Sequence, residues 1–195
     1  MSTILHALAL IAVLAVPRVC AQTGYQAPNL KLELFGGFST APMEPGRANG
    51  EGLSRVRLNG WTASVTSYQV FRRWGLTAEV SGHSRNKDGL DVSTQTFLFG
   101  GTYRSFERKR FALTGRILAG VNRWDPASIP PGGYLTQNSF TFAFGQSVDI
   151  KLAEQFAIRV QPGLAFIRRT EAGGDRKLTL MTPLSVGVAF KFGKR

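Results

Sequence analysis

The chain has 195 residues, which is enough for one domain, and a net charge of +12 at pH 7. Its only cysteine, Cys20, lies near the amino terminus, so the remainder of the chain excludes a disulfide framework, a thiol nucleophile and a cysteine metal site. The sequence has no clustered basic helix or recognition motif of the kind that binds nucleic acid, so we expect no nucleic-acid partner.

The amino-terminal segment predicts a secretory signal peptide. Residues 4–16 are almost wholly apolar, and Val19, Cys20 and Ala21 form a cleavage pattern before Gln22. The apolar run is shorter than the about 20 residues that a membrane-spanning helix needs, and no later run approaches that length. We therefore expect a signal peptide over residues 1–21 and one exported domain over residues 22–195.

Apolar and polar residues alternate in eight segments of the exported domain, which is the period of a β-strand. In chain order these segments cover residues 30–39, 56–68, 76–82, 92–103, 111–121, 139–150, 156–167 and 184–192. In the last segment Val186, Val188 and Phe190 share one face, and Ser185 and Lys191 share the other. A strand with one wholly apolar face suits a wall in contact with lipid.

The connections between these segments alternate in length. Those near residues 40–55, 83–91, 122–138 and 168–177 are long, whereas those near 71–75, 105–110 and 151–155 are short. This alternation is typical of outer-membrane barrels, whose long loops lie outside the cell. An exported chain without an apolar helix can span lipid only as a closed barrel, because every backbone polar group needs a partner there. The predicted fold class is therefore all-β, a closed eight-stranded antiparallel up-and-down transmembrane β-barrel in the bacterial outer membrane.

Three stretches carry a family resemblance: residues 58–65, the turn 72–75 with the residues 76–79 that follow it, and the closing residues 186–192. With them the chain resembles the small outer-membrane β-barrel domain family, and it is similar in form to the barrels of outer-membrane protein A and outer-membrane protein X. The resemblance implies insertion by the barrel-assembly machinery, which recognises a closing strand that ends in an aromatic residue. Here three residues follow Phe192. The resemblance implies no particular activity.

Two sets of side chains are expected in such a barrel. Aromatic residues near the strand ends are expected to form girdles at the membrane interfaces, namely Trp61, Trp74, Trp124, Phe156 and Phe192. Charged residues on the inward face are expected to form an interior polar cluster, namely Glu33, Glu79, Arg116 and Arg159. An eight-stranded barrel has little room beyond its own side chains, so this cluster is either a paired plug or a narrow polar conduit.

The long connections are rich in cations, which we interpret as candidate contacts for anions at the cell surface. They are Arg47, Arg55, Arg85, Lys87, Arg123, Arg168, Arg169, Arg176 and Lys177. The expected partners are outer-membrane lipid, the phosphates of lipopolysaccharide, and ligands from a host or phage.

The sequence predicts an integral outer-membrane protein that acts as a monomer in a structural or surface-interaction role, without catalysis, cofactor or metal. Two alternatives stay open: an outer-membrane enzyme that modifies lipid A, and a soluble, lipocalin-like periplasmic binder. Against the enzyme, residues 83–86 read His-Ser-Arg-Asn and lack the His-x-Ser-Asn pattern of the deacylases. His83 and Ser84 are also adjacent, and adjacent strand residues point to opposite faces.

Overall fold

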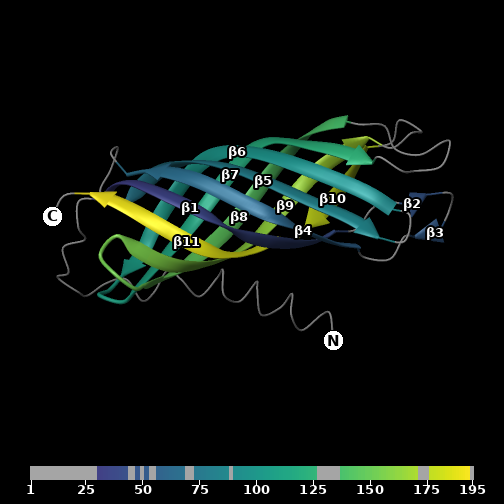
Figure 1. Ribbon diagram of the computed structural model, residues 1–195. Coiled ribbons are helices and arrows are strands. Elements are labelled where there is room, and N and C mark those ends of the chain that lie inside the picture. The colour runs from purple at the N-terminus through teal and green to yellow at the C-terminus, as the bar shows by residue number, and fades with distance from the viewer. Residues whose placement is uncertain are drawn as a thin grey trace.

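A computed structural model of the chain describes residues 30–43, 47–48, 51–52, 56–68, 73–87, 90–126, 137–170 and 176–193. The predicted signal peptide over residues 1–21 lies outside this part of the chain. Within the described ranges, no helix has the length and apolar character needed to cross a membrane. The described elements are β-strands (Figure 1).

Nine strands form one sheet, and two short strands form a separate hairpin. The strands are β1 (Leu30–Met43), β2 (Arg47–Ala48), β3 (Glu51–Gly52), β4 (Val56–Ser67), β5 (Trp74–Lys87), β6 (Leu90–Glu107), β7 (Phe111–Pro126), β8 (Gln137–Lys151), β9 (Phe156–Thr170), β10 (Arg176–Met181) and β11 (Leu184–Gly193). Thr182 and Pro183 separate β10 from β11, but both strands pair with β1 and β9. They therefore fill a single position, and the nine strands occupy eight positions in the sheet.

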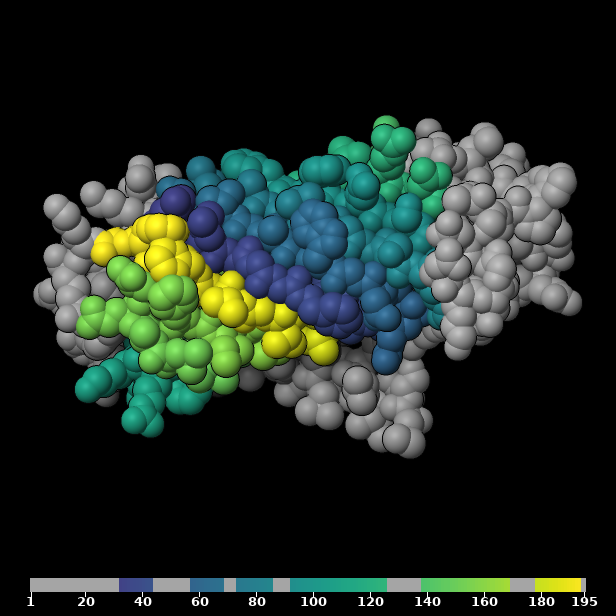
Figure 2. Space-filling model, in the orientation of Figure 1, coloured from purple at the N-terminus to yellow at the C-terminus, as the bar shows by residue number. Residues whose placement is uncertain are grey.

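The sheet closes on itself because β1 pairs with β4 on one side and with β11 on the other. Each strand pairs antiparallel to its neighbours, and the neighbours follow chain order around the wall. Figure 2 shows β11 lying directly against β1 along the closing seam. The predicted fold class is confirmed, because the described strands form a closed, eight-stranded, antiparallel up-and-down barrel.

The two ends of the barrel differ. Short turns join β4 to β5, β6 to β7 and β8 to β9 at the end where β11 terminates, whereas β2 and β3 lie at the opposite end (Figure 1). In outer-membrane barrels the short turns lie in the periplasm and the longer connections lie outside the cell. We therefore call the short-turn end the inner end and the opposite end the outer end.

Three predicted long connections are shorter than expected, because the strands continue into them. β5 and β6 remain paired as far as Lys87 and Leu90, although residues 83–91 were predicted as a loop. β9 and β10 remain paired as far as Thr170 and Arg176, and β7 also runs past its predicted end. β6 has 18 residues, whereas a tilted strand crosses a membrane in about 9 to 11. Beyond the apolar band both faces of a strand can be polar, so the alternation ends while the backbone ladder continues.

Glycine lets the two strands of the closing seam approach each other. Gly37 of β1 and Gly187 of β11 are partners in the ladder. A β-carbon on Gly37 would lie 2.7 Å from the α-carbon of Gly187, which is closer than such atoms approach in proteins. A β-carbon on the neighbouring Gly36 would meet no atom within 4 Å. The seam therefore needs glycine at position 37 and tolerates a side chain at position 36.

Replacing Gly37 with valine is expected to impair closure of the barrel. A side chain forced against backbone costs about 1–3 kcal/mol of folding free energy. The variant should lose part of the compact, fast-migrating form on an unheated gel, and it should unfold at a lower urea concentration. Gly36→Val is the matched control and should behave like the parent protein. An equal loss in both variants would contradict the assignment of the seam contact.

Candidate functional site: the barrel interior and its outer rim

The barrel is apolar on its outer surface and polar inside. In β11, Val186 and Val188 are 47% and 53% exposed, whereas Ser185 and Lys191 are 3% and 5% exposed. The same arrangement continues around the wall, where large apolar side chains are exposed and Thr, Ser and charged side chains are buried. A soluble lipocalin-like binder requires the opposite arrangement, whereas this exterior suits contact with hydrocarbon.

Buried charges are concentrated inside the inner end of the barrel. Glu33 on β1 accepts hydrogen bonds from Arg104 on β6, at 2.9 Å, and from Arg159 on β9. Asp149 on β8 accepts from Arg159 Nε at 2.6 Å and from Lys191 Nζ at 2.5 Å. Five strands therefore contribute to one network, in which each carboxylate binds cations from at least two strands.

The network extends to the inner mouth of the barrel. Glu107, near the end of β6, pairs with Arg104 at 3.3 Å and with Lys151 at 2.5 Å. Three carboxylates and four cations are thus joined, and their side chains are at most 12% exposed. Buried charges are stable only when they are paired, so this network links strands that are not neighbours in the sheet.

A second charged pair lies further along the barrel. Arg116 on β7 pairs with Glu79 on β5, which also accepts a hydrogen bond from Gln161 at 3.0 Å. The Arg116 guanidinium lies directly over Gly145, where a β-carbon would be 3.2 Å from Nη2. Gly145 therefore provides the space through which the guanidinium reaches across the interior.

The four residues predicted for the interior cluster all lie inside the barrel, but they belong to two separate groups. Glu33 and Arg159 are in the inner network, and Glu79 and Arg116 form the second pair. The sequence prediction did not include Arg104, Glu107, Asp149, Lys151 or Lys191. Asp149 and Lys191 fall on the inward phase of their strands, so the period-two pattern could have identified them. Arg104 follows the predicted end of its strand, where a register shift between Arg104 and Phe106 obscures the phase.

Uncharged polar side chains fill the interior beyond the second pair. His83 Nε2 lies 2.8 Å from Ser39 Oγ, which lies 2.9 Å from Ser185 Oγ. Asn122 donates to Thr94 at 2.6 Å, which continues the polar layer on other strands. His83 points inward and is 3% exposed, whereas the adjacent Ser84 is exposed on the outer surface.

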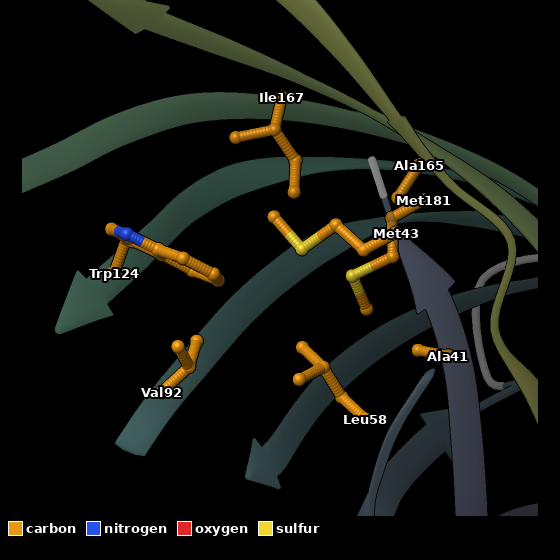
Figure 3. Close-up of a cluster of buried hydrophobic side chains, with 8 residues drawn as sticks. All are labelled: Ala41, Met43, Leu58, Val92, Trp124, Ala165, Ile167 and Met181. Atoms are coloured by element: carbon orange, nitrogen blue, oxygen red, sulfur yellow. The ribbon is translucent and has the colours of Figure 1, made fainter. Parts of the chain in front are cut away.

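An apolar cluster closes the interior near the outer end. Figure 3 shows Met43, Met181, Ile167, Trp124 and Leu58 converging from different strands. The full cluster also contains Ala41, Val92 and Ala165. Between this plug and the second charged pair lies a cavity of about 20 Å³, which has room for a water molecule but not for an organic ligand. Charged pairs, uncharged polar side chains and the apolar plug therefore fill successive levels of the described interior.

Trp124 was predicted in an aromatic girdle, and the structure shows that this assignment is wrong. Its side chain is 3% exposed and forms part of the apolar plug. The reason is the length of β7: because the strand continues to Pro126, Trp124 shares the inward phase of Leu118 and Asn122. The other predicted girdle residues, Trp61, Trp74, Phe156 and Phe192, are 42–55% exposed on the outer surface.

Most of the basic residues predicted for loops lie instead on strands near the outer end. Arg123 and Arg168 are exposed on the outer surface, and Arg85 is half-buried. Arg47, Lys87, Arg169, Arg176 and Lys177 belong to strands, but their side chains lie outside the described part of the structure, as does the whole of Arg55. The loop assignment was wrong for these strand residues, because the hairpins extend beyond the apolar band.

Three outward arginines stand directly above the apolar band. On β7, Arg123 follows the exposed Val121, and on β9, Arg168 follows Phe166 on the same face. On β4, the exposed Arg57 lies two outward positions beyond Trp61. We call Arg57, Arg123 and Arg168 the outer rim. They lie at the level where a membrane changes from hydrocarbon to headgroups.

No group of three or more histidine, cysteine, aspartate or glutamate side chains that could hold a metal ion occurs within the described ranges. The inner carboxylates, which are the strongest candidate ligands, are bound to arginine and lysine.

No family model matches the chain, and neither does any curated protein. Solved structures do match it. Neisserial surface protein A aligns with a TM-score of 0.65 and 12% identity over 83% of this chain and 97% of that protein. The chain has the fold of the small outer-membrane barrels.

Two further structures extend this similarity. OprG of Pseudomonas aeruginosa aligns with a TM-score of 0.58 and 13% identity, over 86% of this chain and 98% of that protein. Ail, the attachment invasion locus protein of Yersinia pestis, aligns with a TM-score of 0.57 and 14% identity, over 84% of this chain and 99% of that protein. A second Ail structure, aligned at 0.52, contains the heparin analogue sucrose octasulfate. From the shared fold and the apolar exterior together, we conclude that the chain is an integral protein of the bacterial outer membrane.

Removing Glu33 is expected to destabilise the barrel strongly. Glu33→Gln leaves two buried guanidiniums with fewer anionic partners, and breaking a buried ion pair costs about 3–5 kcal/mol. The free energy of unfolding, measured by urea titration in lipid vesicles, should fall by an amount near the lower end of that range. The double variant Glu33→Gln/Arg104→Gln should recover part of the loss. No difference between the parent and the single variant would contradict the role of this network.

Proposed function

We propose that the protein is a sealed, non-catalytic barrel that holds anionic ligands at the cell surface, with lipopolysaccharide phosphate as its principal ligand. The observation that carries this proposal is the outer rim. Its three exposed arginines lie at the outer edge of the apolar surface, and side chains fill the described interior behind it. The apolar wall anchors the protein, and the outer rim is the part of its outer end that can recognise an anion.

The chemistry of the outer rim favours phosphate. Guanidinium groups form paired hydrogen bonds to phosphate oxygens and remain charged under all physiological conditions. The phosphates of lipid A lie at the membrane surface, which is the level of Arg57, Arg123 and Arg168. The binding of sucrose octasulfate by Ail supports the proposal, since that ligand is also densely anionic and that protein has the same fold.

The filled interior supports a surface role over transport. An inner charge network, a charged pair and an outer apolar plug follow one another along the barrel. A solute would have to separate buried ion pairs and displace the plug in order to pass, and either change is costly.

Neutralising the outer rim should weaken binding to lipopolysaccharide. Each basic residue at an anionic surface contributes about 1 kcal/mol, so Arg57→Gln/Arg123→Gln/Arg168→Gln should lower the affinity substantially. Retention of lipopolysaccharide by the folded, detergent-purified barrel can be measured by native mass spectrometry. The matched control is Asn59→Ala/Gln95→Ala/Asn138→Ala, which alters three exposed neutral residues at the same level. Equal retention by the two triple variants would contradict the proposal.

Catalysis on lipid A is the alternative that this proposal excludes. A hydrolase working at the membrane surface needs its histidine and serine together and open to lipid. Here His83 is buried inside the wall, and Ser84 lies on the opposite face. His83→Ala should therefore leave the mass spectrum of lipid A from expressing cells unchanged, relative to the parent protein. Loss of a lipid A modification in the variant would instead establish an enzyme.

A further inference from the structure

The inner end of the barrel carries a second group of exposed cations, on two neighbouring turns. Arg73 precedes β5, and Arg108, Lys109 and Arg110 form the whole turn between β6 and β7. All four residues are exposed. Arg73 lies beside β6, the strand that leads into the turn of residues 108–110, because the amide of Arg104 on β6 donates to the carbonyl oxygen of Arg73 at 2.9 Å. We call these four residues the inner rim.

Carboxylates do not neutralise the inner rim within the described part of these turns. Glu107 is the nearest acidic residue in the sequence, and its side chain is 6% exposed. It is already paired with Arg104 and Lys151 inside the barrel. The internal network therefore holds the Glu107 carboxylate inside the barrel, whereas the four side chains of the inner rim are exposed.

The inner rim adjoins three aromatic residues on the outer surface, Trp74, Tyr103 and Phe111, which we call the aromatic shelf. Trp74, 55% exposed, packs against Tyr103 with 4.8 Å between ring centroids, and Phe111 is 49% exposed. The guanidinium carbon of Arg108 lies 5.3 Å from the centroid of the Phe106 ring. Exposed aromatic rings of this kind mark the boundary between hydrocarbon and headgroups.

The short turn keeps the cations close to this boundary. Lys109 and Arg110 are within two residues of Phe111, and the amide of Arg108 donates to the carbonyl oxygen of Phe111 at 2.7 Å. A strand residue advances about 3.3 Å, so the backbone of the turn lies within about 7 Å of the shelf. The headgroup layer of one leaflet is about 5–7 Å thick, so the cations lie within it and not deep in the periplasm.

Among the turns that the structure describes at the inner end, the inner rim lies on the side of β5, β6 and β7. The next turn, between β8 and β9, consists of Leu152, Ala153, Glu154 and Gln155, and it contains no cation. If these cations served solubility alone, the two neighbouring turns would not need to differ in charge. A binding site for an anion on the side of β5, β6 and β7 accounts for it.

We propose that the inner rim is a binding site for anionic phospholipid in the periplasmic leaflet, with the aromatic shelf contacting the upper acyl chains. The ligand is defined by its chemistry, a phosphodiester headgroup with net negative charge attached to two chains, as in phosphatidylglycerol. The site is separate from the outer rim, because the two lie at opposite ends of the barrel.

The test uses Trp74 as a local reporter in the folded, full-length barrel. In a Trp61→Phe background, Trp74 is the lipid-facing tryptophan, since Trp124 is buried in the plug. The protein is folded into phosphatidylcholine vesicles that contain equal fractions of chain-brominated phosphatidylglycerol or chain-brominated phosphatidylcholine. Fluorescence quenching then compares the occupancy of the two lipids beside Trp74.

We expect brominated phosphatidylglycerol to occupy the site more than fivefold in preference to brominated phosphatidylcholine, since one cation at an anionic surface contributes about a fivefold factor. Arg108→Gln/Lys109→Gln/Arg110→Gln should abolish this preference. The matched control Arg57→Gln/Arg123→Gln/Arg168→Gln removes three charges from the outer rim and should preserve it. Unheated gel migration shows that each variant is folded.

Equal quenching by both lipids in the parent background would overturn the proposal. A preference that survives loss of the three inner cations would also overturn it, since the shelf alone would then select the lipid. Absence of any lipid preference, combined with cation-dependent binding to isolated peptidoglycan, would replace it with a cell-wall partner. The binding of lipopolysaccharide by the outer rim is tested by its own retention experiment. A negative result at the inner rim therefore leaves the proposed surface function unaffected.

Discussion

The structure depends on one constraint, which is that hydrocarbon offers no hydrogen-bond partner to a peptide group. Every strand in contact with lipid must therefore have a neighbour on both sides, and a sheet achieves this only by closing. The barrel closes where β1, the first strand, pairs with β11, the last, while β4 pairs with the other side of β1. The close approach of Gly37 and Gly187 at this seam follows from the same requirement.

Closure also determines what the interior can hold. The inward faces of eight strands converge, so charged side chains from distant parts of the sequence come within bonding distance of each other. Glu33 and Arg159 are 126 residues apart in the chain, yet they form a buried ion pair. Such charges are tolerated only because each carboxylate binds several cations, and the resulting network fills the barrel. The apolar plug around Trp124 and Met181 seals the other end by packing alone.

Since side chains fill the described interior, we propose that interaction with other molecules takes place on the outer surface. Its apolar band is bordered by arginine at the outer end and by arginine and lysine at the inner end. In both proposals these borders meet the phosphates of the membrane, and both can be tested without disturbing the core. We therefore propose that the protein is a stable cylinder whose recognition groups are arranged at its two edges.

The sequence by itself determined the strands, their inward and outward phases and the closed barrel, because period-two alternation is a local property and lipid permits few solutions. It also placed Glu33, Glu79, Arg116 and Arg159 on the inward face. It could not give the strand ends, since polar extensions such as the β5–β6 hairpin lack the alternating pattern. For the same reason Trp124 was assigned to an aromatic girdle, although it lies in the apolar plug. Only the tertiary structure decided which charges meet, because the pairing of Asp149 with Lys191 depends on stagger and tilt around the closed wall.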